Sequence, residues 1–146
     1  MKFRDTTPPG ARIFEARLQV QWADVDVAGI MYFAAYTRFA EYAEMQLFAE
    51  LGFPYESVFN EHGFWLPRVH VEADYHAPAL MSDWLRMRTY VEHVGASSLR
   101  WRTVFINERT GEPGAVMAFI VAAIDAETKK SRPLPEPLRA VLLSCV

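Results

Sequence analysis

Only one cysteine occurs in the chain, Cys145, next to the last residue, so no intrachain disulfide can form. Small secreted domains usually depend on disulfides, and a reducing compartment is therefore the natural expectation. Residues 1–12, MKFRDTTPPGAR, contain no apolar run of the kind found at the centre of a secretory signal peptide. We therefore expect a cytoplasmic protein.

Long hydrophobic runs and clustered positive charges are also missing. The longest apolar run, residues 114–124, is much shorter than the ~20 residues that a membrane-spanning helix needs. The net charge is −3 and no basic run reaches five residues, whereas nucleic-acid-binding domains are usually strongly basic. Neither a membrane nor a nucleic acid is expected as a partner.

Several common catalytic signatures are absent from the sequence. The segment GASSL, residues 95–99, does not match the G-x-S-x-G elbow of serine hydrolases. No glycine signature for binding the phosphates of a nucleotide is present either. Cys145 follows a segment that reads as a short terminal helix, and it is a poor candidate for a nucleophile.

The 146 residues suit one domain, and neither a repeat nor a low-complexity linker divides them, so we treat residues 1–146 as a single domain. After Gly29, apolar residues recur at intervals of three and four, which is typical of one face of a helix. They are Tyr36, Phe39, Ala40, Ala43, Leu47 and Leu51. Gly52, followed by Pro54, ends the pattern. The helix is apolar on more than half of its circumference and is therefore expected to be mostly buried.

Segments with a period of two indicate strands before and after this helix. RLQVQWA precedes it, and VHVEADYHA, WLRMRTYVEHV and SLRWRTVFI follow it. A further segment, AVMAFIVAAI, is apolar throughout, as in a strand covered on both faces. Short connections favour antiparallel neighbours, so we expect an α+β domain in which an antiparallel sheet of about five strands wraps one long central helix. A short helix over residues 137–143 is expected to close the chain.

The polar side chains of the VHVEADYHA strand, His70, Glu72, Asp74 and His76, share one face. Imidazole and carboxylate groups together suit zinc, so a metal site is one interpretation. A polar strand face, either wet or against a partner subunit, is the simpler one, because the histidines lack a His-x-x-x-His spacing. We expect no metal and no cofactor.

The stretch VQWADVDVAGIMYFAAY, residues 20–36, places Asp24 and Asp26 in an otherwise almost wholly apolar run. A charged carboxylate in such surroundings costs several kcal/mol unless it has partners. Either both carboxylates lie in a wet surface turn, or one of them is held in a cleft for chemistry. Gly29 allows a tight turn here and aromatic residues flank the pair on both sides, which favours the cleft.

This stretch resembles the opening motif of the 4-hydroxybenzoyl-CoA thioesterase family, small hotdog-fold acyl-CoA thioesterases. The family motif contains an aromatic residue, Asp-x-Asp, two residues, a glycine and then the central helix, as in QWADVDVAGIMYFAAYTRFAEYAEMQLF. The likeness continues through PRVHVEADYHAPALMSDWLRMRTYVEHVGASSL and AAIDAETKKSRPLP, so it spans roughly residues 15–137. It implies a hotdog fold and a homodimer or homotetramer whose site lies at a subunit interface.

The family's catalytic carboxylate is the second aspartate of the motif, which the resemblance places at Asp26, and its glycine falls on Gly29. Some members have a histidine seven residues after that aspartate, where this chain has Phe33. Some relatives also carry a basic cluster for the phosphates of coenzyme A. Residues 95–97 (GAS) stand in its place here, with Ser98 kept, so phosphate binding must be arranged differently.

The expected activity is hydrolysis of a small or medium acyl-CoA, aromatic acyl groups included, to the free acid and coenzyme A. A thiol leaving group has a pKa near ~8.5, so one carboxylate and backbone N–H donors at an uncapped helix start can suffice. Asp26 is the expected nucleophile or general base. The expected substrate-binding residues are Gly29, Tyr32, Phe33, Tyr36 and Glu41, the last facing inward. The expected CoA-binding residues are Gly95, Ser97, Ser98, Lys129, Lys130 and Arg132.

Two other functions are alternatives at this point. A hotdog protein that binds an acyl thioester without hydrolysing it would show no turnover against a thioester panel. A hotdog dehydratase would need a histidine with a carboxylate in its site, and no histidine lies near Asp26 in the sequence. The identity of the acyl group, the nucleophilic or basic role of Asp26, and the choice of dimer or tetramer stay open.

Overall fold

The computed structural model describes residues 7–146, so part of the N-terminal stretch discussed above, residues 1–6, lies outside it. Its strands are β1 (Phe14–Gln19), β2 (Phe64–Trp65), β3 (Arg68–Tyr75), β4 (Trp84–Val94), β5 (Ser98–Asn107), β6 (Glu112–Ala122) and β7 (Ile124–Asp125). Its helices are α1 (Ala35–Glu50), α2 (Tyr55–His62), α3 (Glu136–Leu143) and the short 3-10 helix η1 (Trp22–Asp24).

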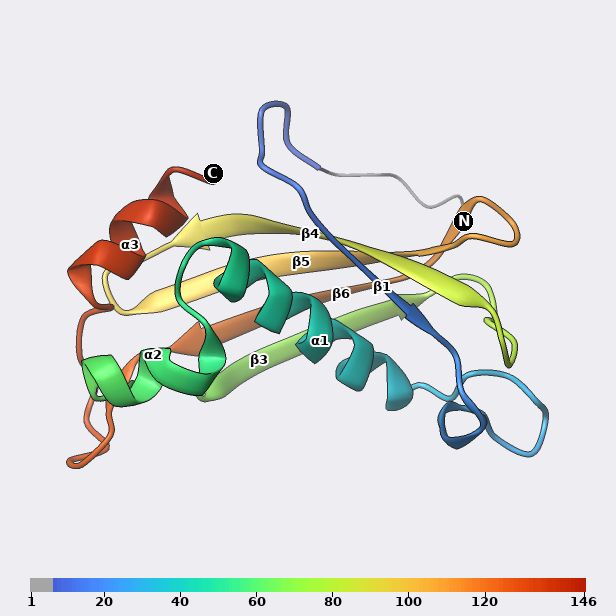
Figure 1. Cartoon of the computed structure of the whole chain (residues 1–146), viewed down its shortest axis with the longest axis horizontal. Helices are drawn as coiled ribbons and strands as arrows, with labels where there is room; N and C mark the ends of the chain where they lie inside the picture. Colours follow the sequence, from blue (N-terminus) through green and yellow to red (C-terminus); the bar gives the residue numbers. More distant parts are fainter. Residues whose placement is uncertain (1–6) are drawn as a thin grey trace.

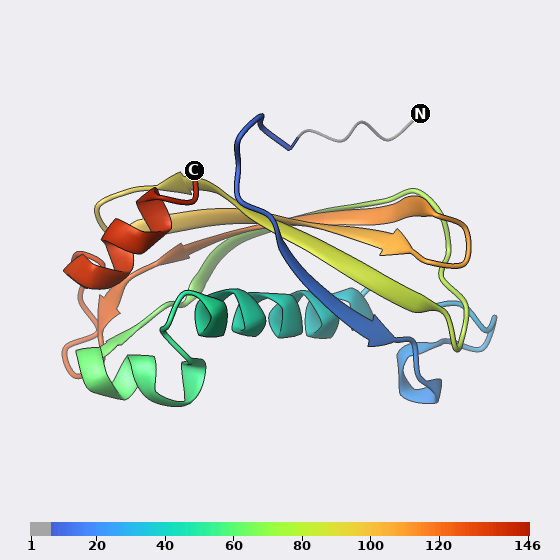
Figure 2. The same ribbon diagram turned by 45° about the horizontal axis from the view of Figure 1, so that its top comes forward.

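Five antiparallel strands form the main sheet, in the order β1-β4-β5-β6-β3, and β2 pairs with β7 in a second, small sheet. The main sheet curves over α1, which lies along one of its faces (Figure 2). The predicted architecture of one long helix wrapped by a five-stranded antiparallel sheet is therefore confirmed.

The core lies between α1 and the concave face of the sheet. The apolar residues that predicted the helix face, including Phe39, Ala43 and Leu47, are at most 2% exposed. They pack against side chains that alternate along the central strands, such as Met87 and Trp101. Burying each large apolar side chain contributes about 1.5–3 kcal/mol, so this face holds α1 to the sheet.

The convex face of the sheet carries a network of ion pairs that includes Glu72 of β3. Glu72 on β3 accepts a hydrogen bond from Arg100 on β5 at 2.6 Å, and Arg100 also reaches Glu92 on β4 at 2.5 Å. The side chains of β3 and β5 reach each other across β6, where the small Ala118 lies between Glu72 and Arg102. This agrees with the simpler interpretation of the polar ladder, a polar strand face, because Glu72 pairs with Arg100.

Strand β3 has only β6 as a neighbour, so its other edge pairs with no strand of residues 7–146. Its side chains are exposed along almost its whole length, including the apolar Val69, Val71 and Tyr75. An exposed edge strand with apolar side chains is a place where another chain can pair. Within residues 7–146, no helix is long and apolar enough to cross a membrane.

Candidate active site

The segment between β1 and α1 is a folded turn that Asp24 holds in shape. Asp24 is 3% exposed, and its carboxylate accepts hydrogen bonds from the backbone N–H of Gln21 at 2.8 Å and from Arg38 at 2.7 Å. Its carbonyl oxygen accepts from the N–H of Tyr32 at 3.1 Å. Two donors, the Gln21 N–H and the Arg38 guanidinium, satisfy this buried charge, and the bond to Tyr32 ties the backbone, so Asp24 braces the turn.

Asp26, two residues further, is exposed at the tip of the same turn. Its N–H donates to the carbonyl of Ile30 and its carbonyl accepts from the N–H of Gly29 at 2.9 Å, which requires the positive φ of +78° that Gly29 adopts. One carboxylate oxygen, Oδ1, accepts from the N–H of Ala28 at 2.8 Å. The other, Oδ2, has no partner in the described residues and is free to react.

The start of α1 lies close to this turn along the chain and supplies backbone donors. Ala34 is the N-cap and makes no side-chain cap, as the sequence predicted. The N–H groups of Phe33 and Ala34 donate to no acceptor within residues 7–146. Uncapped N–H groups at a helix start, together with the helix dipole, favour an oxygen that carries negative charge.

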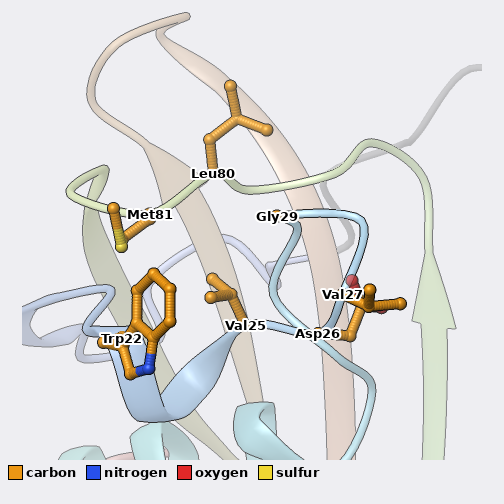
Figure 3. A pocket seen from close by; sticks show the side chains of 7 residues that line it. All are labelled: Trp22, Val25, Asp26, Val27, Gly29, Leu80 and Met81. Carbon is orange, nitrogen blue, oxygen red and sulfur yellow. The ribbon is translucent and has the colours of Figure 1, made fainter.

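A hollow of about 720 Å³ lies on one side of the turn (Figure 3). Apart from Asp26 its lining is apolar: Trp22, Val25, Val27, Gly29, Leu80 and Met81. In Figure 3 the side chain of Asp26 lies beside Val27, away from Trp22 and Met81. This hollow therefore offers apolar surface and few hydrogen-bonding groups.

A second hollow, of about 370 Å³, also has Asp26 in its lining and is aromatic. Tyr32, Phe33, Tyr36 and Tyr75 line it, so three predicted substrate-binding residues come together here. Tyr75 donates from its hydroxyl to the carbonyl of Phe33 at 3.0 Å, and its ring meets that of Tyr36 edge-on at 5.2 Å. Burial, together with Tyr75, raises the pKa of Tyr36 to about 12, so its phenol stays protonated at neutral pH.

A distant loop forms the wall opposite Asp26 and is fixed by Asp83. The Asp83 carboxylate accepts from the N–H of Leu80 at 2.9 Å, from Asn107 at 2.8 Å and from Arg109 at 2.8 Å. The hydrogen bond from Arg109 is the largest cause that lowers the pKa of Asp83 to about 2. Sequence reasoning missed this wall, because Leu80 and Met81 lie more than fifty residues from Asp26.

The prediction that Glu41 faces inward is wrong, because its side chain is exposed on α1. The inward carboxylate is Glu44, which is 2% exposed. Glu44 lies four residues after Ala40 and three before Leu47, two positions of the apolar face. That spacing was a signal in the sequence that could have found it.

The predicted CoA-binding residues gather at the other end of α1 from Asp26 (Figures 1 and 2). The β4–β5 turn with Gly95 and Ser97, next to Ser98 at the start of β5, touches the C-terminal tail, because Leu134 donates its N–H to the carbonyl of Ala96 at 2.9 Å. Arg132 donates to the carbonyls of His62 and Gly63, and the ammonium of Lys129 lies 3.6 Å from the centre of the Trp65 ring.

Within residues 7–146 the side chain of Lys130 has neither a hydrogen-bond acceptor nor an aromatic ring as a partner. The structure thus brings turn and tail together, but not to the Asp26 of the same chain.

Comparison with known proteins agrees with this fold. Residues 20–142 match the model of the thioesterase-like superfamily. The 1,4-dihydroxy-2-naphthoyl-CoA hydrolase of Synechococcus elongatus is 30% identical over 82% of this chain and 88% of its own, and the acyl-CoA thioester hydrolase YbgC of Escherichia coli is 24% identical over 88% and 94%. A solved thioesterase-superfamily structure from Jannaschia sp. superposes with a TM-score of 0.83 at 26% identity, covering 99% of each chain. The chain therefore belongs to the thioesterase-like superfamily, and the expectation of a hotdog-fold thioesterase is confirmed.

Proposed function

We propose that the protein hydrolyses the thioester bond of an acyl-CoA and that Asp26 carries the reaction. The observation that supports this most is that Asp26, whose Oδ2 has no partner within residues 7–146, lines both an apolar and an aromatic hollow. A thioester has an acyl arm and a pantetheine arm, and two hollows that share Asp26 in their lining suit a carbonyl carbon held next to that residue.

The chemistry needs few groups. Oδ2 either takes a proton from a water that attacks the carbonyl carbon, or attacks that carbon itself to give an acyl-aspartate that water then cleaves. In both routes the C–S bond breaks, the sulfur leaves as a thiolate and the acyl group leaves as a carboxylic acid. We expect the N–H groups of Phe33 and Ala34, at the start of α1, to stabilise the oxyanion.

A panel of acyl-CoA thioesters, with released thiol as the signal, tests the proposal directly. The panel should contain aromatic and aliphatic acyl groups of matched size, which also identifies the preferred acyl group. Binding of acyl-CoA without turnover across the whole panel would support the non-hydrolytic alternative instead.

We also propose that a second copy pairs with the free edge of β3. An antiparallel ladder between two β3 strands would continue the sheet and cover Val71 and Tyr75, the exposed apolar side chains on its helix side. Such a pair brings the start of one β3 beside the end of the other. The β4–β5 turn and the basic tail of one copy then lie at the same end as the Asp26 of its partner.

Replacing Ala73 with proline should give a monomer. The N–H of His76 bonds to Gly114 on β6, so by alternation the N–H of Ala73 points to the free edge. Proline removes that donor without removing a bond inside the chain. Sedimentation velocity at micromolar concentration should show a dimer or larger for the wild type and for Ala73→Ser, and a monomer for Ala73→Pro. A monomeric wild type would contradict the pairing.

The CoA-binding residues remain a prediction, which the structure sharpens. Arg132 binds backbone carbonyls, so its replacement would disturb the fold, whereas Lys129 and Lys130 lie exposed in the tail. The Lys129→Ala/Lys130→Ala variant should raise KM by about three- to tenfold with little change in kcat, because phosphate contacts bind the ground and transition states alike. Arg12→Ala, another exposed cation, is the control. An unchanged KM in the lysine variant would show that coenzyme A binds elsewhere.

A further inference from the structure

A charged cluster lies beneath the C-terminal half of α1, away from the turn that carries Asp26. Arg68, the first residue of β3, donates to both oxygens of the buried Glu44, with 3.0 Å between Nη1 and Oε1. The Tyr55 hydroxyl donates to the same carboxylate. The guanidinium lies over the rings of Trp101 and Phe119, at 5.1 Å and 5.5 Å from their centres.

Stability alone gives little reason to keep this cluster. Burial raises the pKa of Glu44 although Arg68 and Tyr55 lower it, so desolvation outweighs the ion pair. Buried ion pairs can often be replaced by apolar residues at little cost, and what the pair does provide is a fixed orientation. Glu44 on α1 and the two rings hold the guanidinium rigidly at the start of β3.

Arg68 has donors to spare. A guanidinium has five N–H donors, and Glu44 takes two of those of Arg68. The other three have no acceptor within residues 7–146, although the side chain is only 35% exposed. A fixed guanidinium with free donors in a partly dry, aromatic setting is suited to recognise an oxygen atom.

The free edge of β3 determines what lies opposite these donors. Arg68 and Tyr75 are the two ends of β3, and both contact residues on its helix side. An antiparallel pair that uses the full length of β3 places Arg68 of one copy opposite the partner's Tyr75. Tyr75 lines the aromatic hollow next to Asp26, so Arg68 would border that hollow in the partner.

We infer that Arg68, held by Glu44, completes the partner's aromatic hollow and donates a hydrogen bond to an oxygen on the acyl group. This inference rests on the proposed function and deepens it by naming the substrate class: thioesters whose acyl group carries a hydroxyl or keto oxygen away from the thioester. Because Glu44 already balances the charge of Arg68, a neutral oxygen suffices as acceptor. An acyl group without it leaves desolvated donors unpaired, which lowers its rate.

Selectivity is the quantity to measure, as the ratio of kcat/KM for 4-hydroxyphenylacetyl-CoA to that for phenylacetyl-CoA. The Glu44→Gln/Arg68→Met variant leaves no unpaired charge in the core, and its ratio should fall about tenfold below that of the wild type. The matched control is Glu92→Gln/Arg100→Met, which removes an ion pair from the opposite face of the same sheet. A purely structural role of Arg68 predicts an unchanged ratio in both variants, and that result would overturn the inference.

Mixed dimers show which copy supplies the arginine. Two differently tagged chains, Asp26→Asn and Glu44→Gln/Arg68→Met, are produced together and the mixed dimer is isolated through both tags. Its only site with Asp26 has Arg68 from the partner, so it should turn over at about half the wild-type rate per dimer with the wild-type ratio. If the mixed dimer instead shows the kcat/KM ratio of the double variant, the inference is overturned, because Arg68 would then act in the site of its own chain.

Failure of the proposed function would be seen separately. A wild-type protein that hydrolyses no thioester, or an Asp26→Asn protein that remains active, contradicts the proposed function before Arg68 is considered. A different outcome contradicts only the inference about Arg68. In that outcome hydrolysis depends on Asp26, but the mixed dimer shows the kcat/KM ratio of the Glu44→Gln/Arg68→Met variant.

Discussion

Replacing Asp26 with asparagine should lower kcat by at least ~10²-fold, the range expected when an acid–base group is lost. The amide keeps the shape of the carboxylate and can still accept from the N–H of Ala28, so the turn should survive. The amide has neither the proton affinity nor the nucleophilicity of the carboxylate oxygen Oδ2. Steady-state kinetics on the preferred acyl-CoA gives kcat, and calorimetric titration with the same substrate should show affinity close to that of the wild type.

Asp24→Asn is the matched control, because the two aspartates differ in their partners and not in their chemistry. Asp24 is buried and holds Gln21 and Arg38, whereas Asp26 keeps one free oxygen. Asp24→Asn should therefore lower the free energy of unfolding by about 1–2 kcal/mol while much of the activity remains. If Asp24→Asn alone is inactive, the roles of the two residues are reversed. If Asp26→Asn turns over at nearly the wild-type rate, the mechanism is wrong.

The fold could be predicted from the sequence because its long elements have clear periods. Intervals of three and four between Phe39 and Leu47 fix the buried face of α1, and alternation fixes the faces of β3, β4 and β5. The first strand begins three residues earlier than expected, at Phe14, because its pairing with β4 decides its bounds. The helix α2 and the pair β2–β7 were not predicted. They are short, and contacts between distant segments decide them.

In the candidate site, too, the residues close together in the sequence were predicted and those from distant segments were not. Asp26, Gly29 and the aromatic residues after them are neighbours along the chain, so one motif and its family resemblance predicted them together, and they line the two hollows. Tyr75 and the Leu80–Met81 wall come from other parts of the chain, and only the packed sheet brings them to the turn. The Glu44–Arg68 pair joins residues 24 apart and was missed for the same reason.

Replacing Arg68 alone with methionine should lower the free energy of unfolding by about 3 kcal/mol near neutral pH. The substitution leaves Glu44, which is 2% exposed, charged without its main partner and with only the Tyr55 hydroxyl as a donor. The Glu44→Gln/Arg68→Met variant should recover most of the loss, because it has no charge to bury. Urea unfolding of the wild type and both variants, at one protein concentration since an oligomer's stability depends on it, measures the differences.

The same experiment at lower pH checks the cause. Burial raises the pKa of Glu44 already in the wild type, and loss of Arg68 should raise it further. A carboxyl group whose pKa is raised in the folded state contributes stability that is present at pH below its unfolded pKa and is lost as pH rises through its folded pKa. The deficit of Arg68→Met should therefore shrink as the pH is lowered from neutral towards the ordinary pKa of a glutamate, while that of the double variant stays constant. A deficit independent of pH would mean that Arg68 stabilises the fold through its stacking on Trp101 and Phe119 and not through the charge of Glu44.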